Sequence, residues 1–113
     1  MSSCLFCQIA TGERPATIVY RSDDVVAFRD IHPQAPTHIL IIPAKHIVSV
    51  AEATVADEGL IGRMITVAQE IAQQENLNNG YRLVINTGAQ AGQSVFHLHV
   101  HLLGGRAMHW PPG

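Results

Sequence analysis

Charged residues are scarce in this sequence. Asp, Glu, Lys and Arg make up only 14% of its 113 residues, and Lys45 is the only lysine. The seven basic residues are scattered rather than clustered, which argues against a surface that grips a nucleic-acid backbone. A monomer with so few charges would have an unusually apolar exterior, so we expect an oligomer that covers part of it. A small phosphorylated ligand is compatible with this composition.

Long apolar runs are missing as well. No stretch is long enough to span a bilayer, and the N-terminus lacks the basic segment and apolar stretch of an export signal. We therefore expect a cytoplasmic protein without a membrane partner. The two cysteines, Cys4 and Cys7, would not form a structural disulfide by default in a reducing compartment. A single domain, residues 1–113, is large enough to fold without one.

The apolar residues follow the period of a helix in some segments and of a strand in others. A helical stripe predicts one long helix over residues 55–76, and a short N-terminal helix is expected over residues 4–10. Asn78-Asn79-Gly80 supplies residues that tolerate left-handed conformations after the long helix. We expect an α+β fold, an antiparallel sheet of about five strands with the long helix on one face. Besides the histidine segment described next, the strands are expected over residues 17–20, 25–28, 38–42 and 81–86.

Three alternating histidines are the most informative feature. His97, His99 and His101 occupy every second position of an otherwise apolar run, residues 94–103. In a β-strand, side chains two residues apart share a face, so the imidazoles would lie on one exposed face of a core strand. The apolar face opposite them would consist of Phe96, Leu98, Val100 and Leu102.

Two kinds of chemistry fit this histidine face. The imidazoles could hold a catalytic zinc ion, although the outer Cα atoms of a straight strand would lie about 13 Å apart, which makes convergence on one ion awkward. Alternatively, one neutral imidazole could attack phosphorus while its neighbours bind phosphate oxygens. The preceding loop, Gly92-Gln93-Ser94, offers N–H groups and a hydroxyl that suit an anion, which favours the second interpretation. A polar surface strand without a site is the remaining interpretation.

The run over residues 97–103 resembles the signature of the histidine-triad (HIT) nucleotide-binding superfamily, in which histidines alternate with apolar residues. Further segments are similar in order and spacing to the Hint branch of that superfamily, so that the resemblance covers nearly the whole chain. These segments are residues 28–31, 33–38, 86–88, 92–94 and 104–113.

The resemblance implies a purine nucleoside phosphoramidase, a hydrolase that cleaves the P–N bond of purine nucleoside phosphoramidates and also acts on aminoacyl adenylates. His99 would be the nucleophile that becomes nucleotidylated, and catalysis would need no cofactor. His101 would contact the α-phosphate, and Ser94 would hold phosphate oxygens and help the departing amine. His38 and Asn86 would support the triad from beside it. A zinc-dependent hydrolase that uses the three histidines, or a non-catalytic nucleotide-binding scaffold, are the alternatives.

The resemblance also implies a nucleotide-binding set. Asp30 would accept the ribose hydroxyls, whereas an aspartate in this position is otherwise a common turn former. Apolar side chains would surround the purine without distinguishing adenine from guanine. The full set is Leu5, Phe6, Ile9, Phe28, Asp30, Ile31, Asn86, Gly92, Gln93, Ser94, His99 and His101.

Cys4 and Cys7 form a C-x-x-C pair, which alone fits a redox, metal-binding or purely structural role. Some members of the superfamily hold a structural zinc ion with such a pair and two histidines, whose positions match His46 and His97 here. His97 therefore has two implied roles, zinc ligand and support for the catalytic site.

The C-terminal tail, residues 108–113, has an implied role as well. In the Hint branch this segment crosses a homodimer interface, which would bring Trp110 to the leaving-group side of the partner's site. Simple burial of Trp110 at the interface is the alternative.

Overall fold

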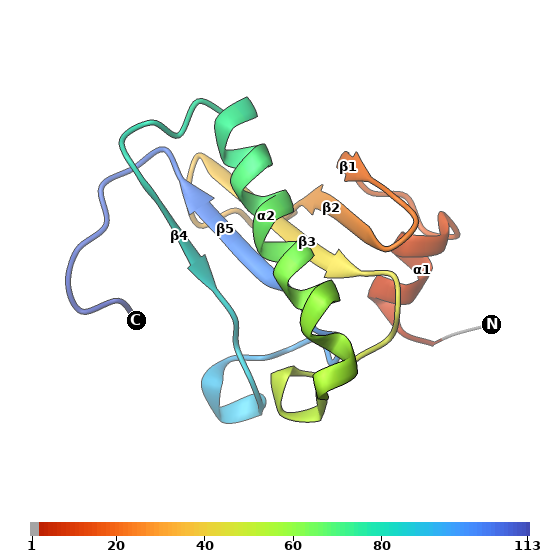
Figure 1. Cartoon of the computed structure of the whole chain (residues 1–113). Helices are drawn as coiled ribbons and strands as arrows, with labels where there is room; N and C mark the ends of the chain where they lie inside the picture. Colours follow the sequence, from red (N-terminus) through yellow and green to blue (C-terminus); the bar gives the residue numbers. More distant parts are fainter. Residues whose placement is uncertain (1–2) are drawn as a thin grey trace.

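A five-stranded antiparallel sheet forms the centre of the structure, a computed structural model that describes residues 3–113 (Figure 1). Residues 1 and 2 of the expected domain lie outside the described part. The strand order is β1-β2-β3-β5-β4, which confirms the α+β architecture expected from the sequence. The strands are β1 (Ile18–Arg21), β2 (Val25–Arg29), β3 (Thr37–Pro43), β4 (Tyr81–Val84) and β5 (Val100–Gly104).

Two helices cover opposite faces of this sheet. The long helix α2 (Glu58–Gln74) crosses one face, and the short helix α1 (Leu5–Thr11) packs against β2 and β3 on the other (Figure 1). Every residue of β3 is buried, as expected for a central strand with both faces covered. Alternate residues of the central strands therefore enter two separate cores. The core under α2 includes Ala27, Ile39, Ile41, Met64 and Ile71, and the core under α1 includes Phe6, Ile9, Val26, Phe28 and Leu40.

The long helix is shorter than its apolar stripe predicts. Residues 55–57 form a 3₁₀ turn, η2 (Val55–Asp57), in which Thr54 and Asp57 make a capping box, and α2 begins only after it. At the other end α2 stops at Gln74, and Asn76 adopts a left-handed conformation with φ of 59°. The expected stop at residues 78–80 is thus late, although Gly80 also has a positive φ, of 121°. Two more 3₁₀ turns are η1 (Val50–Glu52) and η3 (Ala89–Ala91).

The histidine segment is a strand only in its second half. β5 begins at Val100, so that His97 and His99 precede the paired part of the segment, which corrects the expected strand over residues 94–103. The expected alternation nevertheless holds for Leu98, Val100 and Leu102, which all lie in the core under α2. Phe96, expected in the same core, is 51% exposed.

The histidine face is not exposed, which corrects a second expectation. His97 is completely buried and His99 is 6% exposed, whereas His101 is half-buried. The cause is α1, because the Phe6 ring packs edge-on against both buried imidazoles, with ring centroids 6.0 Å from His97 and 5.1 Å from His99. The site therefore lies beneath the N-terminal helix.

Within residues 3–113, no further strand pairs with either edge of the sheet. β1 and β4 are the outer strands, and the C-terminal tail runs beside β4 before the chain ends (Figure 1). Arg82 of β4 ties the tail down by donating to the carbonyls of His109 and Pro112. No helix within residues 3–113 is long and apolar enough to cross a membrane.

Candidate functional site

A mostly apolar cavity of about 480 Å³ opens between α1, the end of β2 and the segment that leads into β5. Its walls bring together residues more than 80 positions apart in the sequence, as a binding site on a two-layer fold requires. Most of the expected nucleotide-binding residues line it, namely Leu5, Phe6, Ile9, Phe28, Asp30, Ile31, Ser94, His99 and His101.

The tautomer of His99 follows from its hydrogen bond. Nδ1 of His99 lies 2.7 Å from the carbonyl oxygen of His97, and a carbonyl can only accept, so Nδ1 carries the proton. A neutral imidazole has one N–H, so Nε2 of His99 is left with an unshared electron pair. His99 lines the cavity, and a ring with this tautomer has the unprotonated nitrogen that a nucleophile requires.

His101 receives the opposite tautomer through His38. The backbone N–H of Gln34 donates to Nδ1 of His38 at 3.0 Å, so His38 carries its proton on Nε2. That N–H lies 2.9 Å from Nδ1 of His101, which must accept, so His101 carries its own proton on Nε2. His101 can therefore donate a hydrogen bond from Nε2 to an anion in the cavity that it lines.

Burial favours the neutral forms of His101 and His38 by lowering the pKa of each. Desolvation lowers the pKa of His101 to about 4, with smaller contributions from His99 and His38 in the same direction. The pKa of His38 is also lowered by burial, against the opposing charge of Asp30. Neutral imidazoles are the forms that the tautomer assignment requires, so the hydrogen-bond chain persists at neutral pH.

Asp30 connects the cavity wall to this chain. Its Oδ1 accepts from the backbone N–H of His32, and its Oδ2 lies 3.4 Å from Nε2 of His38. Both oxygens are acceptors, and Asp30 is the only acid among the described residues that line the cavity. A carboxylate of this kind suits a pair of vicinal hydroxyl groups.

Three expected nucleotide contacts do not line the cavity. The buried side chain of Gln93 accepts from the N–H of Gly88 and donates to the carbonyls of Val48 and Val95, so it organises the loop. Asn86 lies beside Gly92, whose missing Cβ would be 3.7 Å from Nδ2 of Asn86. These residues hold the loop that precedes the histidine segment and do not face the cavity.

Ile31, one of the apolar side chains expected around the purine, lines the cavity but is 86% exposed at its rim. It follows β2 in a loop that leaves the sheet, so no second layer covers it. Sequence analysis also missed several cavity residues, since nothing in a linear pattern brings the loop after α1 to the end of β2. They are Arg14, Pro15, Ala16, Arg29, His32, Leu40 and Val95.

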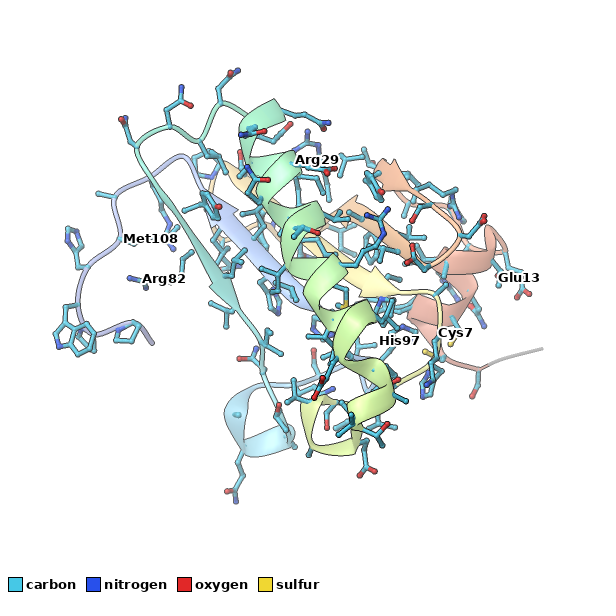
Figure 2. All side chains as sticks on the ribbon, viewed as in Figure 1. Cys7, Glu13, Arg29, Arg82, His97 and Met108 are labelled. Atoms are coloured by element: carbon cyan, nitrogen blue, oxygen red, sulfur yellow. The ribbon has the colours of Figure 1, made fainter. Side chains whose placement is uncertain are left out.

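A second cluster lies beside α1, where Cys7 and His97 approach each other (Figure 2). Sγ of Cys4 and Sγ of Cys7 are each 3.4 Å from Nδ1 of His97, and Nδ1 of His46 is 3.3 Å from Sγ of Cys7 and 3.2 Å from Nδ1 of His97. The four donor atoms all lie within 4.8 Å of one another. Tetrahedral zinc with bonds of about 2.0–2.3 Å needs ligand atoms roughly 3.3–3.8 Å apart, so the set fits that ion.

The tautomer of His97 also fits a metal. Nε2 of His97 donates to the carbonyl of Pro43 at 2.8 Å, which leaves Nδ1, the atom that faces the sulfurs, without a proton. Burial lowers the pKa of His97, an effect that His46 and His99 reinforce. Four protein ligands fill all positions of a tetrahedral zinc ion, so a Cys₂His₂ set is typical of structural rather than catalytic zinc sites.

Asp30, His38 and His101 form another compact group of possible metal ligands. The tautomer of His38 argues against an ion there, because its Nε2 carries a proton while the N–H of Gln34 occupies Nδ1. We interpret this group as a hydrogen-bond chain.

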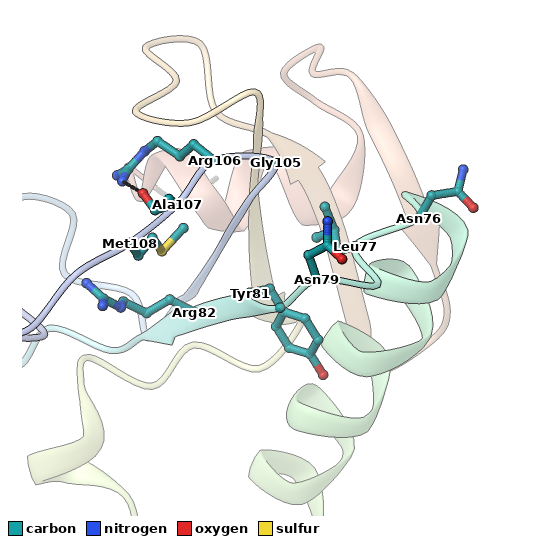
Figure 3. Close-up of a pocket in the computed structure, with 10 residues that line it drawn as sticks. Asn76, Leu77, Asn79, Tyr81, Arg82, Gly105, Arg106, Ala107 and Met108 are labelled. Carbon is teal, nitrogen blue, oxygen red and sulfur yellow. Dashed lines mark hydrogen bonds between the residues drawn. The ribbon is translucent and has the colours of Figure 1, made fainter.

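A larger cavity of about 720 Å³ lies at the far edge of the sheet, between the start of β4 and the segment after β5 (Figure 3). It contains none of the histidines. Arg106 at its wall donates to the carbonyl of Ala107 (Figure 3). Arg106 also donates to the carbonyl of Gln34. Trp110, expected on the leaving-group side, is 87% exposed on the tail and does not line the histidine cavity of its own chain.

Comparison with known proteins gives relatives along the whole chain. It is 52% identical over 109 residues, 96% of each chain, to an uncharacterized HIT-like protein of Synechococcus elongatus. It is 51% identical over 114 aligned positions to the 14 kDa zinc-binding protein of Zea mays, and the alignment covers 99% of this chain and 89% of that protein.

Solved structures share the fold. The crystal structure of a HIT family hydrolase from Legionella pneumophila Philadelphia 1 superimposes with a TM-score of 0.96 at 53% identity, over 98% of this chain and 100% of that one. The histidine triad nucleotide-binding protein of Candida albicans gives a TM-score of 0.83 at 28% identity, over 98% and 85% of the two chains. Residues 11–108 match the HIT domain. This match covers the histidine segment and the cavity walls outside α1, and the chain belongs to the HIT domain family.

Proposed function

We propose that this protein is a nucleotide-binding hydrolase that cleaves the P–N bond of purine nucleoside phosphoramidates, and the acyl-phosphate bond of aminoacyl adenylates, through a nucleotidyl-histidine intermediate. The observation that carries the proposal is the assignment of opposite tautomers to two neighbouring histidines of one cavity. His99 presents an electron pair and His101 presents an N–H. A nucleophile beside a donor for phosphate oxygens is the arrangement that covalent phosphoryl transfer requires.

The first step forms a bond between Nε2 of His99 and phosphorus while the P–N bond breaks. The leaving nitrogen takes a proton, and Ser94, whose hydroxyl lies in the same cavity, is the proposed donor. His99 then carries the nucleotide on Nε2 and keeps its proton on Nδ1, where the carbonyl of His97 stabilises the positive ring. Water attacks phosphorus in the second step while the bond between phosphorus and Nε2 breaks, and the proton that water loses returns to the Ser94 oxygen. The nucleoside monophosphate leaves and the neutral imidazole is restored.

Geometry favours this mechanism over a zinc-dependent hydrolase that uses the three histidines. Nδ1 of His97 faces the two sulfurs and Nδ1 of His101 faces His38, whereas Nδ1 of His99 is bound to the carbonyl of His97. Within residues 3–113, neither group of possible metal ligands contains His99.

The relatives support the same proposal. The Legionella protein is described as a hydrolase and the Candida protein as nucleotide-binding. The zinc-binding description of the maize relative supports a structural zinc ion held by Cys4, Cys7, His46 and His97. Such an ion would fasten α1 to the sheet and take no part in the chemistry.

We also propose a homodimer. The low charge of the chain, the open edge at β4 and the exposed Trp110 all support a partner at this end of the sheet. A cytoplasmic location stays a prediction.

One experiment tests the catalytic proposal. The protein is mixed with an adenosine or guanosine phosphoramidate, quenched with acid-free denaturant, and examined by mass spectrometry for a nucleotidylated peptide that contains His99. We expect the adduct in the wild type, and no adduct with most of the turnover lost in His99→Ala. His109→Ala, a change in the exposed tail, serves as the matched control and should keep the adduct. Normal turnover by His99→Ala would rule out the nucleophile.

A further inference from the structure

Arg14 is a cation on the wall of an otherwise apolar part of the histidine cavity. On the basis of the proposed function, we infer that Arg14 reads the purine and selects 6-oxopurines, guanine and hypoxanthine, over adenine. The apolar walls alone would hold either base, so this residue supplies a discrimination that stacking cannot.

The order of the cavity residues along α1 and the following loop places Arg14 at the end of the wall that lies away from His99, where the purine base would bind. Phe6 touches the ring of His99, the proposed point of attack on phosphorus, and Ile9 follows one helical turn further along α1. The helix ends at Gly12, whose φ of 86° turns the chain, and Arg14 comes two residues later. The phosphate and the far edge of the base would therefore lie at opposite ends of this wall.

Arg14 is held in place at two points. Its backbone N–H donates to the carbonyl of Gln8 at 3.2 Å, and its Nε donates to Oε1 of the Gln8 side chain at 3.1 Å. The structure gives the two terminal nitrogens of Arg14 no acceptor among the described residues. The outer edge of the guanidinium thus keeps its donors for a ligand while Gln8 fixes the plane.

The chemistry of the bases decides what such an edge accepts. Guanine and hypoxanthine present two neighbouring acceptors, O6 and N7, which a guanidinium can bind with two hydrogen bonds. Adenine presents N7 beside an amino group, so one guanidinium N–H would face another donor. Arg14 therefore favours guanine and hypoxanthine and disfavours adenine.

The other cation of this wall is already paired. Arg29 makes a two-point ion pair with Glu75 through N–O distances of 2.9 Å and 3.0 Å, so its charge is largely neutralised. Asp30 is assigned to the ribose and takes part in the histidine chain. Of the two arginines that line the cavity, Arg14 is therefore the one whose terminal donors are available to a base edge.

The test measures the binding of GMP, IMP and AMP by calorimetry, together with kcat/KM for the matching phosphoramidates. We expect the wild type to prefer GMP and IMP to AMP, and Arg14→Met to reduce that preference about fivefold, the lower end for a two-point arginine–guanine pair because Arg14 is exposed. Arg14→Lys should keep part of the preference, and 7-deaza-GMP, which lacks one acceptor, should lose it. Arg106→Met, in the other cavity, is the matched control and should leave the ratios unchanged.

The outcomes separate the two proposals. If Arg14→Met weakens AMP and GMP equally, or changes neither, the inference is overturned while turnover of the phosphoramidates still supports the proposed function. Base preference in binding without any turnover would support the inference and contradict the proposed hydrolase. If none of the three monophosphates binds and none of the phosphoramidates is turned over, both proposals are overturned.

Discussion

At the scale of single residues, three histidines of identical chemistry differ because each has a different hydrogen-bond partner, and we propose a different function for each. The carbonyl of Pro43 leaves Nδ1 of His97 without a proton, the carbonyl of His97 leaves Nε2 of His99 without one, and His38 leaves His101 with its proton on Nε2. None of these partners is the side chain of another triad histidine, and two of the three are backbone carbonyls. The backbone therefore assigns most of the site's proton positions.

The assignment predicts the effect of changing His38. His38→Leu removes the N–H that Nδ1 of His101 accepts, so His101 can adopt the wrong tautomer, and we expect kcat to fall about 10- to 100-fold. His38→Gln, which can place an amide N–H near the same point, should recover part of the loss. Both variants should still form the His99 adduct, only more slowly, in rapid-quench measurements. Equal activity of the Leu variant and the wild type would contradict the relay.

The lowered pKa of His101 predicts a pH dependence of stability. Its pKa is about 4 in the folded protein, below the ordinary value of 6.5, so the unfolded chain binds the proton more readily between these values. The free energy of unfolding should therefore decrease as pH falls from 6.5 to 4, by on the order of 2–3 kcal/mol from this group. Urea unfolding at several pH values measures the effect. His101→Gln should flatten the curve, whereas His109→Gln should not change it.

At the scale of elements, α1 decides the character of the site. It has seven residues, too few for a helix to be stable on its own, yet it buries Phe6 and Ile9 and forms one wall of the cavity. Its packing supplies part of its stability, and the proposed zinc tether through Cys4 and Cys7 supplies the rest. The geometry of the base pocket would then depend on an ion that never touches the substrate.

Removal of the tether gives the prediction for this element. The double variant Cys4→Ser/Cys7→Ser should purify without zinc and unfold at least about 4 °C lower than the wild type. Serine at position 4 can still cap α1, as Sγ of Cys4 does by accepting from the N–H of Cys7, so a loss of stability would report the ion and not the cap. Nucleotide binding should weaken in parallel. A wild-type protein that is free of metal and fully stable would contradict the zinc site.

How far the sequence predicts each element depends on what holds the element in place. The central strands and α2 are predicted because periodic apolar residues determine which side faces a core, as in β3 and the alternation of Leu98, Val100 and Leu102. The prediction that the imidazoles lie on an exposed face was wrong, because the alternation of residues in a strand does not indicate whether another element covers that face. Here α1 covers it. The proximity of the two cysteines to His97 came from the family resemblance, since no local pattern joins positions 93 residues apart.

At the scale of the whole molecule, an unpaired strand edge and exposed aromatic side chains lie together at one side of the sheet. β4 is an open edge, Tyr81 on it is exposed, and Arg82 holds the tail alongside so that Trp110 projects from the body. An exposed edge strand with aromatic groups beside it tends to associate with other chains, and this protein has few charged residues to oppose such association. A second copy of the chain would cover this edge.

Deletion of residues 108–113 tests the role of the tail in such a dimer. We expect the intact protein to sediment at twice its 12.3 kDa mass, and the truncated protein to change its order of preference among leaving groups, since Trp110 of the partner would lie on that side of the cavity. Preference between purines should not change, because Arg14 and the base walls belong to the same chain. Arg82→Met, which releases the tail without removing Trp110, should give a smaller change in the same direction. An unchanged order of leaving groups would exclude a role in specificity, and a monomeric wild type would exclude the dimer.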